Sequence, residues 1–600
     1  LLSVRTGRWQ TWDGQIYADL PYIDVTRLGQ YVSLDARIRE GNGAVRLWAD
    51  VEDGQLVGGA ADLGLDRVDA SLGKGLQPLV LRSVTGRLAG QRDDDTLEFS
   101  TTALQFDTSD GMRWPGGNLW LQHTPAKGRT LEKGALRADR LDLAALALIA
   151  DRLPLGEATH RVLDSYAPRG LVEHIDLSWQ GSLGAPDKYQ ARGRVSGLRV
   201  ASQPAPSAPT APPAATTTAA PATTAAAATH PRAHPGTPGL SGATIDFDAT
   251  QAGGTAALAI AQGTLEFPGV FEEPVIPIDR LSTQLQWKLD NGNAQVQVSK
   301  LRFANTDAEG DAEASWRTSD PAVSSGKGRF PGVLELQGKL TRADGTRVFR
   351  YLPLDIPQHT RDYVRDSVTK GTASTVDFRV RGDLHDMPFL DPKRGEFRIA
   401  AKVADVNYAY VPPSAPAIPS RTGAPPLVWP PLTGLSGELV FERDSMLVRN
   451  ARGRLAGTNG IEVTKGEAQI PELSSHTPLL RVDVQAKGPL GEVLRVGAPL
   501  AGSEKDGVGE HMLRARATGT ADYKLHLELP LAAMDNAKVQ ASIALADNEL
   551  QFVPEAPSLT HAKGTLNFTE TGFSLAGVQA KLLGGDIRLE GKGRFTGPNP

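Results

Sequence analysis

The histidines are the residues whose spacing in this chain could hold a metal ion. His230 and His234 are four residues apart, which on a helix would place both imidazoles on one side. Each is followed by a proline, however, inside a segment of almost pure Ala, Pro and Thr, and proline opposes a helix there. His160 and His359 stand in two similar segments, and we expect a structural or solvent-facing role for both. The histidines therefore indicate no metal site.

Acidic and nucleophilic residues give no clearer sign of catalysis. Asp93, Asp94 and Asp95 form a dense acidic run, but the run lacks the ligand spacing of a calcium loop and is typical of a solvated turn. No Gly-x-Ser-x-Gly, phosphate-binding or dinucleotide motif occurs, and no pair of carboxylates stands out as glycosidase acids. The chain has no cysteine, which excludes thiolate sites and disulfides. We expect no enzyme, no catalytic residue, no metal and no cofactor.

Charge and hydropathy exclude two further classes of function. The 600 residues carry a formal net charge of -5, without the basic surface that binding to a phosphate backbone requires, so nucleic acid is a poor partner. The most apolar run, Leu141 to Ala150, is shorter than the ~20 residues of a membrane-spanning helix. The chain starts at Leu1, and we interpret it as a fragment of a longer protein, so the absence of a membrane anchor from this sequence is weak evidence against one.

The elements that must position any site are predicted to be β-strands. In "STVDFRVRGDL", Val376, Phe378 and Val380 alternate with Asp377 and Arg379, so apolar and charged side chains point to opposite faces. Many other stretches repeat this pattern, with Gly, Asn and Asp between them. The pattern predicts a long antiparallel meander with one apolar and one polar face. At about 12 residues per strand and turn, it would hold roughly 40 strands.

Two similar segments interrupt the alternation and predict short helices. They are "RLPLGEATHRVLDSYAPRG", starting at Arg152, and "RYLPLDIPQHTRDYVRDSVTKG", starting at Arg350. In the second, we expect Asp355 to cap the helix, and Lys370 and Gly371 to end it. A degenerate third copy is predicted within residues 491–500. The helices punctuate a tandem repeat.

This repeat divides the chain into parts. Residues 1–201 form a first β-groove unit that ends in a helix and strand segment, and residues 202–239 form a disordered insert of Ala, Pro and Thr. Residues 240–410 form a second unit, residues 411–428 a Pro-rich loop, and residues 429–600 further, shorter units. The fold class predicted is mainly β, an elongated repeating antiparallel β-groove with short helices between its units.

The apolar face of such a sheet must be covered, and there are too few helices to do it. The sheet either packs on a second sheet or curls around its own apolar face. Aromatic residues make up only 6% of the chain, which favours a curled groove with free width inside. The positions that we expect to line the groove are Ile175, Leu177, Leu265, Phe267, Leu285, Trp287, Leu334, Leu336, Val376, Phe378, Val380, Phe397, Ile399, Leu439, Phe441, Leu525, Leu527, Leu529, Leu566 and Phe568.

Three longer stretches resemble the AsmA-like superfamily, in particular its YhdP-type members of Gram-negative bacteria. They are "LEFPGVFEEPVIPIDRLSTQLQWKLDNG", "ADGTRVFRYLPLDIPQHTRDYV" and "WPPLTGLSGELVFERDSMLVRNARGRLAG". The resemblance covers most of the chain outside the insert. It implies a bridge-like phospholipid transporter, anchored in the inner membrane, that crosses the periplasm as a β-groove and supports outer-membrane lipid homeostasis. It implies phospholipids, both membranes and periplasmic or outer-membrane proteins as partners.

Two other functions fit the strand pattern. A periplasmic scaffold for outer-membrane assembly would carry no lipid and would need no continuous apolar stripe. A β-solenoid that binds polysaccharide would show exposed aromatics and paired carboxylates on one face. A lipid conduit requires an uninterrupted apolar stripe across successive strands.

Overall fold

A computed structural model of the chain describes residues 12–30, 37–73, 75–153, 157–182, 185–204, 236–412, 430–498, 512–551 and 554–594. The insert and the Pro-rich loop predicted at 202–239 and 411–428 fall mostly outside these residues. Strands account for 67% of the structure and helices for 11%. The described strands number 28 and belong to one antiparallel, curled and unclosed sheet, which confirms the predicted fold class.

The chain forms two compact units, Leu1–Thr306 (unit 1) and Asp307–Pro600 (unit 2). The division into repeats made from the sequence stays a prediction. The strands of unit 1 are β1 (Gly14–Asp24), β2 (Arg37–Glu52), β3 (Gln55–Ser71), β4 (Leu79–Asp93), β5 (Thr96–Thr108), β6 (Arg113–Trp114), β7 (Asn118–Thr124), β8 (Lys133–Asp142), β9 (Arg169–Ser182), β10 (Ala185–Val200), β11 (Gly239–Thr250), β12 (Gly253–Glu266), β13 (Val275–Asp290) and β14 (Asn293–Ala304).

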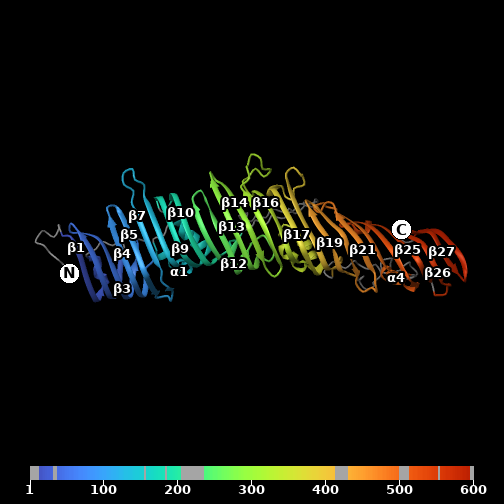
Figure 1. The fold of residues 1–600 in the computed structure, drawn as a ribbon, viewed down its shortest axis with the longest axis horizontal. Helices are drawn as coiled ribbons and strands as arrows, with labels where there is room; N and C mark the ends of the chain where they lie inside the picture. The colour runs from blue at the N-terminus through green and yellow to red at the C-terminus, as the bar shows by residue number, and fades with distance from the viewer. Residues whose placement is uncertain are drawn as a thin grey trace, which may run out of the picture. The chain divides into compact units, whose positions relative to one another are not determined.

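The strands of unit 2 are β15 (Ala308–Arg317), β16 (Val333–Asp344), β17 (Val368–Asp383), β18 (Gly395–Tyr408), β19 (Leu432–Glu442), β20 (Ser445–Leu455), β21 (Glu462–Ile470), β22 (Leu479–Pro489), β23 (Arg516–Thr518), β24 (Thr520–Pro530), β25 (Lys538–Gln551), β26 (Leu559–Thr569), β27 (Gly572–Leu582) and β28 (Gly585–Arg594). Within each unit, strands lie side by side in chain order (Figure 1), except that the short strands β6 and β23 are bypassed, since β5 also pairs with β7 and β22 pairs with β24. The prediction of roughly 40 strands was wrong, because many strands run for 14 to 17 residues.

Helical segments join some of the strands. They are η2 (Val25–Gln30), α1 (Leu143–Ile149), η3 (Ala150–Arg152), α2 (Glu157–Tyr166), η4 (Gly345–Tyr351), α3 (Gln358–Ser367), η5 (Leu384–Asp386), α4 (Leu490–Gly497) and η6 (Met534–Asn536). The paired helices predicted after the Leu-Pro-Leu motifs are α2 and α3, and the third copy is α4. Figure 1 shows α1 and α4 beside the ends of the strands of their own units.

Two details of the α3 prediction were wrong. Pro357, not Asp355, is the N-cap, and it makes no side-chain capping bond. The helix ends at Ser367, so Lys370 and Gly371 belong to β17. The cause is pairing between strands, because β17 pairs with β18 from Val368 onward and this pairing ends the helix early.

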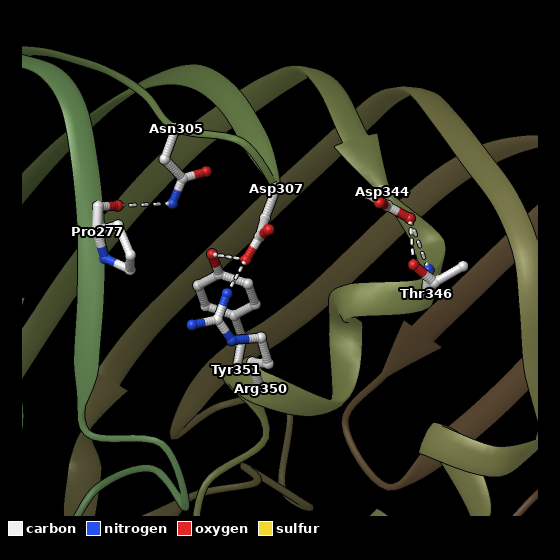
Figure 2. A network of polar contacts seen from close by, with 7 residues as sticks. All are labelled: Pro277, Asn305, Asp307, Asp344, Thr346, Arg350 and Tyr351. Atoms are coloured by element: carbon white, nitrogen blue, oxygen red, sulfur yellow. Dashed lines mark hydrogen bonds and ion pairs between the residues drawn. The ribbon is translucent and has the colours of Figure 1, made fainter.

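Helix α1 was missed from the sequence although its apolar run was noticed. Asp142 caps it, since its carboxylate accepts hydrogen bonds from the backbone N–H groups of Ala144 and Ala145. A related cap begins η4, where the Asp344 carboxylate accepts bonds from the N–H and the hydroxyl of Thr346 (Figure 2). An acidic residue at the end of a strand therefore starts the helical connection in both units.

A line of left-handed backbone residues crosses the sheet, between the middle of the strands and the helical connections. Most of them coincide with a shift of strand register, the mark of a β-bulge, which bends a strand and increases its twist. We infer that these bulges curl the sheet. In unit 1 they include Arg67, Gly86, Ala103, Arg140, Gly170, Gly197, Gly242, Gln262 and Lys300, and in unit 2 Gly371, Asp405, Gly434, Asn450, Asp547, His561 and Gly577.

The helical connections cover one end of the apolar face. In unit 1, Ala145 and Ile149 of α1 pack in a cluster with Val45, Leu65 and Val84 of the sheet. In unit 2, Leu490 of α4 packs with buried residues of β24 to β27. Helix α3 is tied down by a hydrogen bond between the Tyr363 and Tyr408 hydroxyls, 2.7 Å apart. We call this covered part of the strands the helix end, and the opposite part the hairpin end.

A buried ion pair stands at the start of unit 2. The Asp307 carboxylate accepts bonds from the Arg350 guanidinium at 2.7 Å and from the Tyr351 hydroxyl at 3.0 Å (Figure 2). The Asp307 side chain is 6% exposed and that of Arg350 16%. Buried charges remain ionised only when they are paired. This contact therefore joins η4 to the start of β15.

Candidate functional site

Unit 1 carries two unbroken cross-strand rows on its apolar face. Residues directly opposite each other on paired strands present their side chains on the same face of the sheet. A row is the line of such residues that results when each strand pair is followed to the next strand. Row A consists of Ile16, Ala49, Gly59, Gly90, Phe99, Leu121, Leu136, Leu177, Ala191, Ala249, Gly254, Trp287 and Val296. Every member is apolar or glycine, from β1 to β14.

Row B of unit 1 runs beside row A, two residues further along each strand. Its members are Ala18, Leu47, Ala61, Leu88, Thr101, Leu119, Ala138, Ile175, Gly193, Phe247, Ala256, Leu285 and Val298. Thr101 is the exception in polarity, and its hydroxyl accepts a bond from the Leu119 backbone N–H at 3.1 Å. The hydroxyl is therefore turned toward the backbone.

Unit 2 shows the same arrangement. Row C is Gly310, Leu340, Val376, Ala401, Leu439, Val448, Ala468, Val482, Leu527 and Val539. Row D is Ala312, Gly338, Phe378, Ile399, Phe441, Met446 and Ile470. Row E is Gly466, Val484, Leu525, Ala541, Phe568, Phe573 and Gly593. A continuous stripe of apolar residues thus crosses unit 2 from β15 to β28.

The structure brings most of the predicted lining positions together on these faces. Rows A to E contain Leu177, Trp287, Ile175, Leu285, Val376, Leu439, Leu527, Phe378, Ile399, Phe441, Leu525 and Phe568. Leu336, Val380 and Phe397 form a shorter row, and Leu334, Leu529 and Leu566 pair with Trp316, Leu480 and Ile543. Leu265 pairs with Ile276 in the covered cluster of β12 and β13, and Phe267 lies after the end of β12. Their contact with a ligand stays a prediction.

Exposure separates the covered helix end from the rest of the apolar face. On β2, Val45 is 8% exposed, whereas Leu47, the next residue on the same face, is 38% exposed. On β24 of unit 2, Ala521 is 2% exposed and Leu525 36%. Phe99 of row A is 42% exposed. The rows therefore present large apolar side chains that no described part of the chain covers, and exposed apolar surface of this kind marks binding sites.

Two polar side chains on the apolar face are hydrogen-bonded to the protein, whereas the buried Trp179 Nε1 on the same face has no hydrogen-bond partner among the described residues. The Tyr523 hydroxyl donates to the Gly488 carbonyl at 3.1 Å, and burial, followed by the nearby Asp522 charge, raises the pKa of Tyr523 to about 12. Thr283 donates its hydroxyl to the Ser299 carbonyl at 3.1 Å. These groups are satisfied without a polar ligand, so the face is suited to an apolar one.

The opposite face carries charges in cross-strand pairs. Arg87 binds Asp62 at 2.6 Å and also lies over the Trp48 ring, and the bond from Arg87 holds the pKa of Asp62 below its usual range. Arg381 binds Glu335 at 3.1 Å in unit 2. Charged pairs of this kind keep the polar face in water and leave the apolar face as the candidate site.

Other candidate sites are weaker. Two open hollows of about 750 and 450 Å³ are lined mainly by polar side chains, such as Arg452 and Glu462 in the larger and Gln337 and Arg398 in the smaller. Within the described ranges, no group of three or more histidine or acidic residues could hold a metal ion. His230 and His234, which the sequence analysis rejected as a metal site, lie outside the described residues.

The described helices include none that combines the length and hydrophobicity needed to span a membrane.

Comparison of the sequence with known proteins gives one informative result. Neither the curated proteins nor the solved structures contain a match to this chain. A family model described as YhdP protein, by contrast, matches residues 2–598. The match covers nearly the whole sequence, and it agrees with the resemblance that the three quoted stretches carry. The chain therefore belongs to the YhdP protein family.

Proposed function

We propose that this chain is part of a conduit that moves phospholipids between the inner and outer membranes of a Gram-negative envelope. The observation that carries the proposal is the continuity of the exposed apolar rows within each unit. Membership of the YhdP family supports lipid transport as the class of function and the envelope as the location. The acyl chains would lie along the rows, and the head group would remain in water.

The energetics explain why a continuous row is needed. Each methylene that leaves an apolar site for water costs ~0.8 kcal/mol, so a phospholipid with ~30 methylenes meets a barrier of roughly 20 kcal/mol. An apolar face that replaces water at every step along the path removes most of this barrier. No catalytic residue is required, because no covalent bond changes. A gap of even a few polar residues would restore part of the cost.

Curvature supports the same interpretation. An exposed flat apolar sheet would aggregate, whereas a curled and unclosed sheet shelters its apolar face and still leaves an opening for a head group. The helical connections close one end of the face with buried clusters. The rows that remain exposed lie between these clusters and the hairpin end. We infer that the lipid path follows this strip.

Lipid analysis of the purified chain tests the proposal. We expect phospholipid to co-purify in stoichiometric amounts when the chain is isolated from bacterial envelopes without detergent, as measured by extraction and mass spectrometry. A soluble β-sheet protein isolated in the same way is the control. If the chain carries no more lipid than this control, the conduit is wrong, and a scaffold that carries no lipid becomes the better account.

A further inference from the structure

Several aromatic residues on the apolar face are paired directly with a glycine on the next strand. Four of them belong to rows A, B, D and E, and Trp179 lies beside row A, where it is 6% exposed. The pairs are Gly134 with Trp179, Gly254 with Trp287, Gly193 with Phe247, Gly338 with Phe378 and Gly593 with Phe573. They occur in both units.

In each pair the ring lies on the glycine. A Cβ added to Gly134 would stand 2.1 Å from the Trp179 ring, and one added to Gly338 would stand 2.4 Å from that of Phe378. The corresponding distances at Gly254 and Gly593 are both 2.6 Å, and at Gly193 3.1 Å. Distances below 3.0 Å are not tolerated, so an added side chain at Gly134 or Gly593 would have to displace the ring. At Gly254, Gly338 and Gly193 it would also meet a backbone oxygen, at 2.5, 2.6 and 2.8 Å.

This arrangement has a cost that needs an explanation. Glycine inside a strand destabilises it by about 0.5–1 kcal/mol relative to alanine, and an aromatic ring laid across it recovers part of the loss. A bulky aliphatic pair would fill the same face more simply. What the glycine provides is room for the ring to lie flat against the sheet, where it adds apolar surface without standing up from it.

We propose that these glycine–aromatic pairs set the clearance of the lipid path, and that they admit lipids with two acyl chains. The inference rests on the proposed function. A ring of Trp or Phe that stood upright would occupy the space above row A or row D, which a second acyl chain needs. A single-chain lysophospholipid would still pass such a ring.

Gly134 offers the cleanest test, because its three nearest atoms all belong to the Trp179 ring and its φ is not in the left-handed region. Gly134→Ala should therefore push the ring up without disturbing the backbone. Gly90→Ala is the matched control. It adds the same methyl group on row A, and there the nearest atom is a backbone oxygen 3.7 Å away.

The experiment places a benzophenone crosslinker at Leu136, the row A residue next to Gly134 on the same strand face. The probes are dioleoyl phosphatidylethanolamine and the lyso form with the same head group. We expect Gly134→Ala to lower crosslinking of the two-chain lipid about fivefold or more, and to leave the lyso form unchanged. Gly90→Ala should change neither. Adding Trp179→Leu to Gly134→Ala should restore the two-chain signal, because the obstructing ring is gone.

Several results would overturn the inference. Wild-type crosslinking in Gly134→Ala, or a loss that Trp179→Leu does not restore, would show that ring position does not set the clearance. If the double variant fails to fold, the ¹⁹F resonance of 5-fluorotryptophan at position 179 decides instead. It must shift in Gly134→Ala and not in Gly90→Ala, and an unshifted resonance contradicts the proposal. Absence of lipid crosslinking at Leu136 in the wild type would refute the proposed function itself.

Discussion

Placing two carboxylates on the apolar rows of unit 2 is expected to abolish most lipid binding without unfolding the chain. Val376→Asp together with Phe378→Asp puts one charge on row C and one on row D, both on β17. A lipid therefore cannot avoid one charge by following the neighbouring row. Acyl chains that cover these positions would take the charges out of water, at several kcal/mol each. We expect the lipid content to fall about tenfold or more.

The fold should survive because both positions are only half-buried in the sheet, so the new carboxylates can reach water when no lipid is bound. Arg379→Asp is the matched control. It changes the net charge by the same two units, but on the polar face, where Arg379 is 57% exposed and forms an ion pair with Glu396 at 3.9 Å. Circular dichroism and melting must be measured on both variants. Normal lipid content in a folded double variant would favour the scaffold function over the conduit.

Loss of the Asp307 carboxylate should be the most destabilising single change in unit 2. Asp307→Ala removes the acceptor that the Arg350 guanidinium and the Tyr351 hydroxyl share in a nearly buried site. Breaking a buried ion pair by removing one partner costs about 3–5 kcal/mol, because the remaining charge stays desolvated. We expect faster hydrogen exchange in β15 and η4, and a lower melting temperature.

The comparison variant is Glu335→Ala, which breaks the pair with Arg381 on the polar face. The side chains of that pair are 60% and 69% exposed, and exposed ion pairs contribute about 0–1 kcal/mol. If Glu335→Ala and Asp307→Ala changed the rate of hydrogen exchange in β15 and η4 equally, the buried pair would not hold η4 to the sheet. Lipid content should remain normal in Glu335→Ala.

Much of the apolar face could be predicted because its signal is local. Val376, Phe378 and Val380 alternate with charged residues, and a period of two places them on one face whatever strand lies beside them. The same reasoning placed twelve of the predicted lining residues in rows A to E, whereas the other members of these rows, many of them Ala or Gly, were not predicted. Short helices were also predictable where proline and apolar spacing repeat, as in α2, α3 and α4.

What could not be predicted depends on contacts between distant residues. Gly134 and Trp179 are on different strands, separated by α1 and α2, and no local pattern shows that the ring lies on the glycine. The end of α3 at Ser367 is decided by pairing with β18. The bulges at residues such as Lys300 and Asn450 place ordinary side chains in the left-handed region, which composition does not reveal. Helix α1 had a readable signal in Asp142, since an acidic cap followed by Ala and Leu favours a helix.

The most direct test of the central claim uses the tryptophans on the two faces as probes. Trp179 and Trp287 belong to the apolar face, whereas Trp48 and Trp120 lie on the polar face beneath Arg87 and Arg137. A phospholipid with brominated acyl chains quenches indole fluorescence only on close approach. Added to the chain, it should quench a signal that largely disappears when Trp179, Trp287 and Trp316, which pairs with Leu334 on the apolar face of unit 2, are all changed to Phe. The signal should persist in Trp48→Phe/Trp120→Phe. Quenching that is lost with the polar-face pair instead, or no quenching at all, would contradict a lipid path along the apolar rows.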